Sequence, residues 1–167
     1  ALFTNNDEYA EKARIILAHG SKVRYQHEVV GINGRIDALQ ASILNVKLKY
    51  FSQEIKKREQ IGASYFELLK DKALSLPFIE KDRTSVFAQY TVRSVQREKV
   101  TEKLNLNGIP TSIHYPQPLH LQKCYMFLGY KEGDFPIAEK ASKEVFSLPM
   151  SPFLKKEDLV FVCQNIS

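Results

Sequence analysis

Residues 36–70 contain no proline and repeat apolar side chains at helical spacing, and this stretch restricts the fold more than any other. The repeating side chains are Leu39, Ile43, Val46 and Tyr50, followed by Ile61, Tyr65 and Leu68. One uninterrupted helix of this length would extend about 50 Å. Because the apolar stripe loses register near residues 51–53, we expect a bend or break of the helix there.

The five residues before this helix, Gly31-Ile32-Asn33-Gly34-Arg35, have the composition of a loop that contacts an anion. Two glycines let the backbone bend and approach a ligand closely. Asn33 offers an uncharged donor, and Arg35 offers a planar charged fork suited to phosphate oxygens. Both precede a helix, whose free N–H groups and dipole favour anions. A glycine-relieved turn with a surface arginine explains the same residues equally well.

The rest of the sequence predicts an α+β fold around the long helix. The predicted strands cover residues 1–4, 85–95 and 109–113. The predicted helices run from Asn5 or Asn6 to Gly20 and over residues 98–106, 121–128, 137–146 and 156–166. Residues 21–30 are expected to form a polar loop, and residues 114–120 are too rich in proline for a helix or a central strand.

Composition and charge exclude several classes of protein. The formal net charge is +5, and the basic side chains are spread along helices among acids, which indicates a solvated surface and no nucleic-acid interface. No apolar run approaches the length of a membrane span. Cys124 and Cys163 form no CxxC motif and have no nearby pair of histidines at ligand spacing, so no metal site is expected. Buried free thiols in a reducing cytoplasm explain them best, and a disulfide is the weaker alternative.

Histidines flank the proline-rich segment. His114, with Tyr115 beside it, lies at one end and His120 at the other. Loop residues held by prolines are good platforms for ligand contact, although a histidine–tyrosine pair more often serves packing. The sequence contains no nucleophile elbow, P-loop or dinucleotide-binding glycine motif, so the residues themselves name no reaction.

Five segments, read together, resemble the DegT/DnrJ/StrS family of sugar-nucleotide aminotransferases. They are ALFTNNDEYAEKAR, HGSKVRYQH, GINGRIDALQASIL, RSVQREKVTEKLNLNGIPTSIHYPQPLHLQ and GDFPIAEKASKEVFSLPMSPFL. Their order and spacing agree with the family from Ala1 to about Leu154. The resemblance is closest to the branch that aminates the 3-keto group of UDP-linked hexoses or hexuronic acids.

The resemblance implies a cytoplasmic fold-type-I enzyme that uses pyridoxal 5′-phosphate (PLP) as an electron sink, held by a Schiff-base lysine. Residues 1–35 would be the end of the large PLP-binding domain, residues 36–70 a long connecting helix, and residues 71–167 the small C-terminal α+β domain. The lysine would then lie before Ala1. We therefore expect this chain to be a fragment that holds no catalytic residue and does not transaminate alone.

The resemblance also implies a homodimer with shared active sites, in which the GxNxR loop reaches into the partner's site. Asn33 would bind the PLP phosphate there, and Arg35 would contact the nucleotide-sugar. His114 and Tyr115 match residues that contact substrate, and Arg24 is a weaker candidate for the diphosphate or a sugar carboxylate. Glutamate is the expected amino donor, and polysaccharide biosynthesis is the expected context.

Two alternatives remain open. Some members of the family replace the lysine with histidine and dehydrate a keto-deoxysugar, and that position would lie before Ala1. The other alternative is a non-catalytic dimerisation or regulatory module. The apolar side chains of Leu2, Phe3 and residues 15–17 argue against a free-standing module, because they resemble surface built to be covered.

Overall fold

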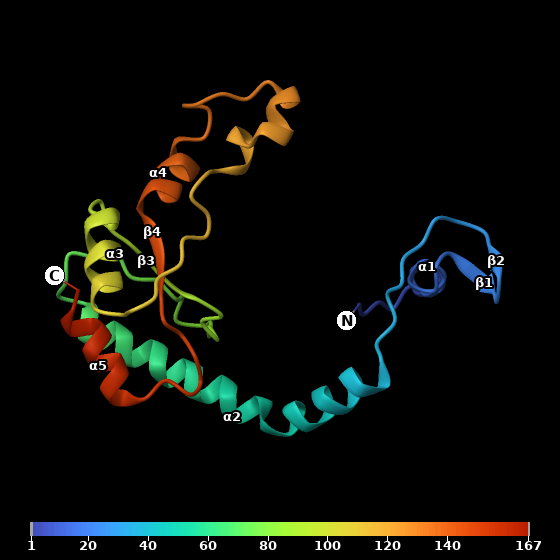
Figure 1. Ribbon diagram of the computed structural model, residues 1–167, viewed down its shortest axis with the longest axis horizontal. Helices are drawn as coiled ribbons and strands as arrows, with labels where there is room; N and C mark the ends of the chain where they lie inside the picture. The colour runs from blue at the N-terminus through green and yellow to red at the C-terminus, as the bar shows by residue number, and fades with distance from the viewer. Residues whose placement is uncertain (1, 167) are drawn as a thin grey trace. The chain divides into compact units, whose positions relative to one another are not determined.

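The computed structural model describes residues 2–166, in which helices and short strands follow each other in mixed order (Figure 1). The elements are α1 (Asp7–Leu17), β1 (Ser21–Val23), β2 (Gln26–His27), α2 (Ala38–Leu69), β3 (Tyr90–Arg93), α3 (Arg97–Leu106), the 3-10 helices η1 (Leu119–Leu121) and η2 (Lys123–Leu128), α4 (Pro136–Glu144), β4 (Val145–Leu148) and α5 (Lys156–Gln164). This mixture confirms the predicted α+β class.

The chain separates into two compact units, Ala1–Tyr50 and Phe51–Ser167. Their boundary falls inside α2. The division into residues 1–35, 36–70 and 71–167 stays a prediction.

The first unit begins with α1, which starts where the sequence predicts. Asn6 is the N-cap, and its side-chain oxygen accepts a 3.1 Å hydrogen bond from the backbone N–H of Tyr9. This bond satisfies one of the free donors at the start of the helix. The strand predicted over residues 1–4 is wrong for residues 2–4, which carry no strand, and residue 1 lies outside the described part.

The predicted polar loop over residues 21–30 contains a small antiparallel hairpin instead. Ser21 pairs with His27 and Val23 with Gln26 across β1 and β2. The backbone of Tyr25 turns between them with a φ of 69°. The strands are two and three residues long and mostly polar, so they carry no alternating pattern that marks a strand in sequence.

The long helix α2 is continuous over 32 residues, and the break predicted near residues 51–53 is wrong. Its length corresponds to about 48 Å. The apolar stripe shifts because the two halves of α2 belong to different units. Leu39 and Ile43 are largely exposed in the first half, whereas Tyr65 and Leu69 are fully buried in the second.

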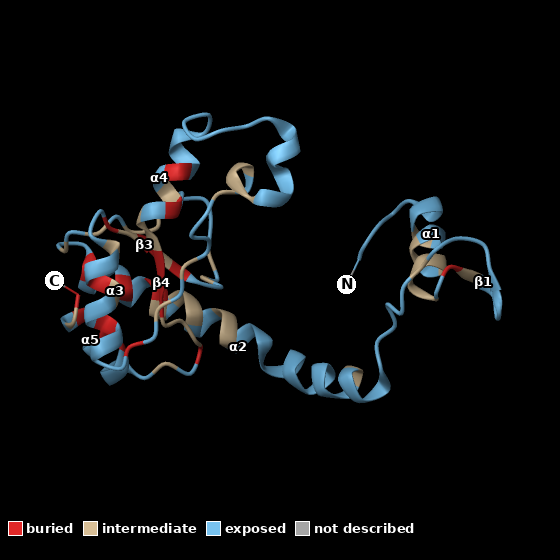
Figure 2. Cartoon of the chain, turned by 45° about the horizontal axis from the view of Figure 1, so that its top comes forward, coloured by how far each residue is buried: buried red, intermediate tan, exposed pale blue. Residues whose placement is uncertain are grey.

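The core of the second unit lies around the two-stranded sheet of β3 and β4. These strands pair antiparallel, with Tyr90 opposite Leu148 and Val92 opposite Phe146. The core residues are Tyr65, Leu69, Tyr90, Val92, Val100, Leu104, Ile109, Phe146, Leu148, Leu159, Val162, Cys163 and Ile166. They come from α2, α3, α5, both strands, the segment after α3 and the residues after α5, and Figure 2 shows buried residues on α3, α5 and the two strands.

Several predicted elements of this unit have different bounds. The strand expected over residues 85–95 covers only Tyr90–Arg93, because Phe87 has a positive φ of 42° that a strand does not accept. The helix expected over residues 137–146 ends at Glu144, and β4 follows at once. Pairing with β3 overrides the helical pattern there. The strand expected over residues 109–113 is reduced to one bridge between Ser112 and Ser147.

The two cysteines are free, as predicted, but they differ in environment. Cys163 is buried in the core, and burial raises the pKa of its thiol to about 11. Cys124 is exposed on η2, so its predicted burial is wrong.

Candidate functional site

The loop of residues 31–35 is fastened to the C-terminal end of α1 by backbone hydrogen bonds. The N–H of Ile32 donates to the oxygen of Ile16 at 2.8 Å, and the N–H of Gly34 donates to the oxygen of Leu17 at 2.9 Å. In the opposite direction, the N–H of His19 donates to the oxygen of Ile32 at 3.0 Å. The loop therefore satisfies carbonyl groups that every helix leaves unpaired at its end.

Two glycines make this close approach possible. A Cβ atom on Gly31 would lie 2.1 Å from the backbone nitrogen of Gly20. A Cβ atom on Gly20 would lie 1.6 Å from the backbone oxygen of Val29, and Gly20 also has a φ of +77°. No side chain fits at either position, so both glycines are required by the geometry of the loop.

Asn33 and Arg35 lie together on this fastened loop. Asn33 forms a β-bridge with Ala18, which fixes its backbone. The Nε–H of Arg35 donates a long, 3.4 Å hydrogen bond to the side-chain oxygen of Asn33. Both residues are exposed, and within residues 2–166 the guanidinium of Arg35 makes no ion pair. One amide and one uncompensated cation on a fixed backbone suit a phosphate or a carboxylate.

Arg24 lies at the turn of the hairpin, in the same unit. Its guanidinium carbon is 4.9 Å from the centre of the Tyr25 ring, and the Tyr25 side chain is 79% exposed. This is a cation–π contact at the surface. The structure gives Arg24 no hydrogen bond to Asn33 or Arg35 among the described residues.

His114 and Tyr115 belong to the second unit, where they follow the Ser112–Ser147 bridge. Their rings meet edge to face with centres 5.5 Å apart, both residues are exposed, and the peptide bond between them is cis. The structure therefore brings the predicted site residues together as two groups. Asn33 and Arg35 share one loop, and His114 and Tyr115 form a pair on the other unit.

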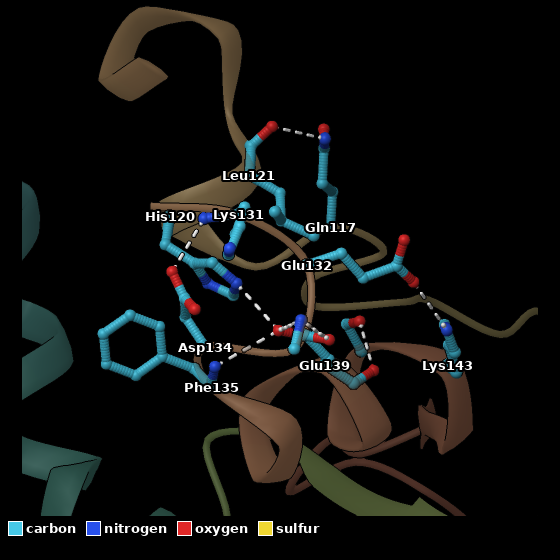
Figure 3. A network of polar contacts seen from close by, with 11 residues as sticks. Gln117, His120, Leu121, Lys131, Glu132, Asp134, Phe135, Glu139 and Lys143 are labelled. Atoms are coloured by element: carbon cyan, nitrogen blue, oxygen red, sulfur yellow. Dashed lines mark hydrogen bonds and ion pairs between the residues drawn. The ribbon is translucent and has the colours of Figure 1, made fainter. Parts of the chain in front are cut away.

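A buried carboxylate organises the segment that follows this pair, and the sequence analysis missed it (Figure 3). Glu139 of α4 is 8% exposed. It accepts hydrogen bonds from His120 Nε2 at 3.0 Å, from the Gly133 N–H at 2.9 Å and from the Phe135 N–H at 3.2 Å. It thereby ties η1 and residues 131–135 to the first turn of α4.

Burial alone would raise the pKa of the Glu139 carboxyl, but the donors around it hold that pKa below the ordinary value of 4.5. The sequence does carry a signal for this contact. Pro136 is the first residue of α4, and an acid in the first turn commonly reaches back to free N–H groups before a helix.

Other kinds of site find no support in the described part of the chain. Within residues 2–166, no three His, Cys, Asp or Glu side chains gather into a group that could hold a metal ion. None of the described helices combines the length and the apolar character needed to cross a membrane.

The whole sequence, residues 1–167, matches the DegT/DnrJ/EryC1/StrS aminotransferase family. The chain belongs to this family. The aminotransferases of the family depend on PLP.

Curated relatives align along the entire chain. A protein named pleiotropic regulatory protein from Geobacillus stearothermophilus is 44% identical over 99% of this chain. The UDP-2-acetamido-2-deoxy-3-oxo-D-glucuronate aminotransferase of Pseudomonas aeruginosa is 43% identical over 100% of it. The dTDP-3-amino-3,6-dideoxy-alpha-D-galactopyranose transaminase of Aneurinibacillus thermoaerophilus is 36% identical over 100%. These alignments cover 45%, 46% and 46% of the relatives, so the chain spans just under half of their length.

Solved structures agree with the fold. The crystal structure of DesV from S. venezuelae is 32% identical, with a TM-score of 0.90 over 97% of this chain and 44% of DesV. The structure of NtdA from Bacillus subtilis, which holds the cofactor PMP, is 27% identical, with a TM-score of 0.79 over 96% of this chain and 41% of NtdA. The described part of the chain thus has the fold of the matching portion of these enzymes.

The residues of the fastened loop fit the phosphate end of a PLP molecule. A phosphate needs hydrogen-bond donors and positive charge that other groups do not already neutralise. Asn33 and Arg35 supply both from a backbone that is already fixed.

Proposed function

We propose that the intact protein is a cytoplasmic PLP-dependent aminotransferase that acts on a nucleotide-linked keto-sugar, with glutamate as the amino donor. The amino group of glutamate replaces the keto oxygen of the sugar, and glutamate becomes 2-oxoglutarate. A UDP-linked 3-keto hexose or hexuronic acid is the proposed substrate, and polysaccharide biosynthesis is the proposed context. This choice is supported by the 43% sequence identity to the Pseudomonas aeruginosa aminotransferase, which extends over the whole chain.

The observation that carries the proposal is the fastened loop, on which an amide lies beside a guanidinium that makes no ion pair with a described residue. Asn33 would donate to the cofactor phosphate, and Arg35 would bind the negatively charged nucleotide-sugar. PLP, when bound, carries the amino group between donor and acceptor. The lysine that holds it would lie before Ala1. The residues of this chain would then contribute positioning and charge rather than proton transfer.

The edge-to-face pair of His114 and Tyr115 would contact the sugar from the second unit. Both side chains are exposed and available to a ligand. Arg24 would interact with the diphosphate or with a sugar carboxylate, and its place on a hairpin turn next to an aromatic ring leaves its N–H groups accessible.

We further propose that the intact protein is a homodimer and that Asn33 of one subunit serves the cofactor of the other. Mixed dimers test this arrangement. At limiting PLP, subunits carrying Asn33→Ala should have low activity as homodimers, and subunits lacking the cofactor lysine should be inactive. Mixing them should restore activity if the site is shared, because one of the two sites regains both groups. No recovery in mixed dimers would contradict the shared site.

Titration of the intact apoenzyme with PLP tests the role of Asn33. Loss of one hydrogen bond to a charged group corresponds to roughly 1.5–3 kcal/mol, so Asn33→Ala should weaken PLP binding by at least about tenfold. Asn105→Ala is the matched control, since Asn105 is an exposed asparagine on α3. Unchanged PLP affinity in Asn33→Ala would contradict this role.

Product analysis separates the remaining alternatives. Formation of 2-oxoglutarate from glutamate, coupled to amination of the keto-sugar, supports transamination. Loss of water from a keto-deoxysugar without consumption of glutamate would identify a dehydratase. Neither reaction, in a protein that still dimerises, would identify a non-catalytic module.

A further inference from the structure

We infer that His27 is a positioning residue for the Asn33–Arg35 loop and acts through the backbone of His19. The inference rests on the proposed function, because it assigns a task to the same loop. His27 is the last residue of β2 and lies outside residues 31–35.

The imidazole of His27 contacts the end of α1 directly. Its Nδ1 atom lies 2.9 Å from the backbone oxygen of His19 and 2.8 Å from the hydroxyl oxygen of Ser21. A carbonyl oxygen can only accept a hydrogen bond, so Nδ1 carries the proton in this contact. A backbone carbonyl commonly fixes the tautomer of a histidine in this way.

His19 connects this contact to the loop. Its oxygen accepts from His27, and its N–H donates to the oxygen of Ile32, the neighbour of Asn33. His19 has a φ of +61°, which is unfavourable for a residue with a side chain and must be held by its surroundings. The bond from His27 supplies part of that support. A displaced His19 would break its bond to the Ile32 oxygen and weaken the bridge between Ala18 and Asn33, although the Ile32 N–H would still donate to Ile16.

A second contact also joins the hairpin to α1, but it is weaker. Lys22 Nζ lies 2.5 Å from a carboxylate oxygen of Glu11, and both side chains are more than half exposed. Exposed ion pairs contribute little and weaken with salt. The contact of His27 is made directly with His19, the residue that donates to the oxygen of Ile32.

The test uses the intact protein and two measurements. In His27→Ala, the amide protons of His19 and Ile32 should exchange with solvent about fivefold faster, and PLP should bind about fivefold more weakly. His27→Asn should restore both, because its side-chain N–H2 lies near the place of Nδ1, whereas His27→Gln should not. His19→Asn is the matched control. Asparagine tolerates a positive φ, and the substitution removes only an imidazole that makes no hydrogen bond or ion pair within residues 2–166.

The outcomes separate this inference from the proposed function. Unchanged amide exchange in His27→Ala, or no rescue by asparagine, would overturn the positioning role. If exchange accelerates and asparagine rescues it, the positioning role stands. Unchanged PLP binding in Asn33→Ala would then overturn only the proposed function.

Discussion

The hydroxyl group of Tyr65 donates a 2.7 Å hydrogen bond to the backbone oxygen of Pro149. The bond joins the middle of the core to the turn that follows β4. Tyr65 is fully buried, and its ring stacks on that of Tyr90 at 4.8 Å. Burial raises the pKa of the Tyr65 hydroxyl above its ordinary value, so the hydroxyl keeps its proton and donates at neutral pH.

Replacing Tyr65 with phenylalanine should therefore remove one buried hydrogen bond and keep the packing. We expect a loss of about 1 kcal/mol in the free energy of unfolding, measured by urea denaturation followed by circular dichroism. Tyr90→Phe is the matched control, because the Tyr90 hydroxyl makes no hydrogen bond to another described residue. An equal loss in both variants would contradict the importance of the bond to Pro149.

Replacing Gly31 with alanine should displace the fastened loop. The new Cβ atom would meet backbone atoms of Gly20, His19 and Ile16 at 2.5 Å or less, and backbone atoms cannot rotate away. We expect a local loss of about 3 kcal/mol, seen as faster amide exchange at Ile32 and Gly34.

Gly129→Ala provides the comparison for this prediction. Gly129 also requires a positive φ, of +79°, but a Cβ atom there would meet nothing within 4 Å. Its replacement should cost about 1 kcal/mol through backbone strain and leave the loop unchanged. Equal amide exchange in the two variants would show that the contact between Gly20 and Gly31 is not what holds the loop.

The two thiols should react at very different rates. Cys124 is exposed, whereas Cys163 is buried and its pKa is raised to about 11. Because the thiolate is the reactive form, a thiol reagent at pH 8 should label one cysteine of this chain quickly and the other only after unfolding. Cys124→Ser should abolish the fast phase. A fast phase that persists in this variant would contradict the burial of Cys163.

Protonation of Glu139 should release the segment that it holds. Its pKa is lowered in the folded protein, so its contribution to stability is complete above the ordinary value of 4.5 and is lost as the pH falls through the folded pKa. Glu139→Gln should therefore be less stable than the parent at pH 7, and the difference should shrink below about pH 4.5.

Amide exchange at Gly133 and Phe135 reports this release, because their N–H groups donate to Glu139. Glu132→Gln is the control. The Glu132 side chain is 75% exposed and is paired with Lys143 at 3.6 Å. A difference between the parent and Glu139→Gln that grows as the pH falls would contradict the prediction.

The sequence could predict those helices that are determined by residues close together in the chain. The start of α1 follows from its capping residue Asn6, and the helices α3 and α5 follow from the spacing of their own apolar residues. The pairing of β4 with β3 could not be read in this way, because it joins residues more than fifty positions apart and overrides a helical pattern. The sequence also did not reveal that α2 is continuous. A shift of its apolar stripe indicates a change of neighbours as readily as a break.

In the candidate site, too, local features could be predicted from the sequence and long-range contacts could not. Asn33 and Arg35 stood out because glycines, an amide and a guanidinium are unusual together in five residues. The anchoring of that loop on α1 was invisible, since backbone hydrogen bonds leave no mark on side-chain identity. Glu139 was missed because the partner that shows its burial, His120, is 19 positions away in the sequence and becomes a neighbour only in the folded segment.

The loop that carries Asn33 and Arg35 owes its shape to main-chain bonds and to two glycines, and to neither of the side chains that it presents. The residues that would contact a ligand are therefore different from those that hold the loop in shape. A new side chain at position 33 or 35 would change which ligand is preferred without rebuilding the loop, so mutation can explore new ligands at little cost to folding. The same independence makes these two positions suitable for a saturation library in which altered specificity, rather than misfolding, limits the number of working variants.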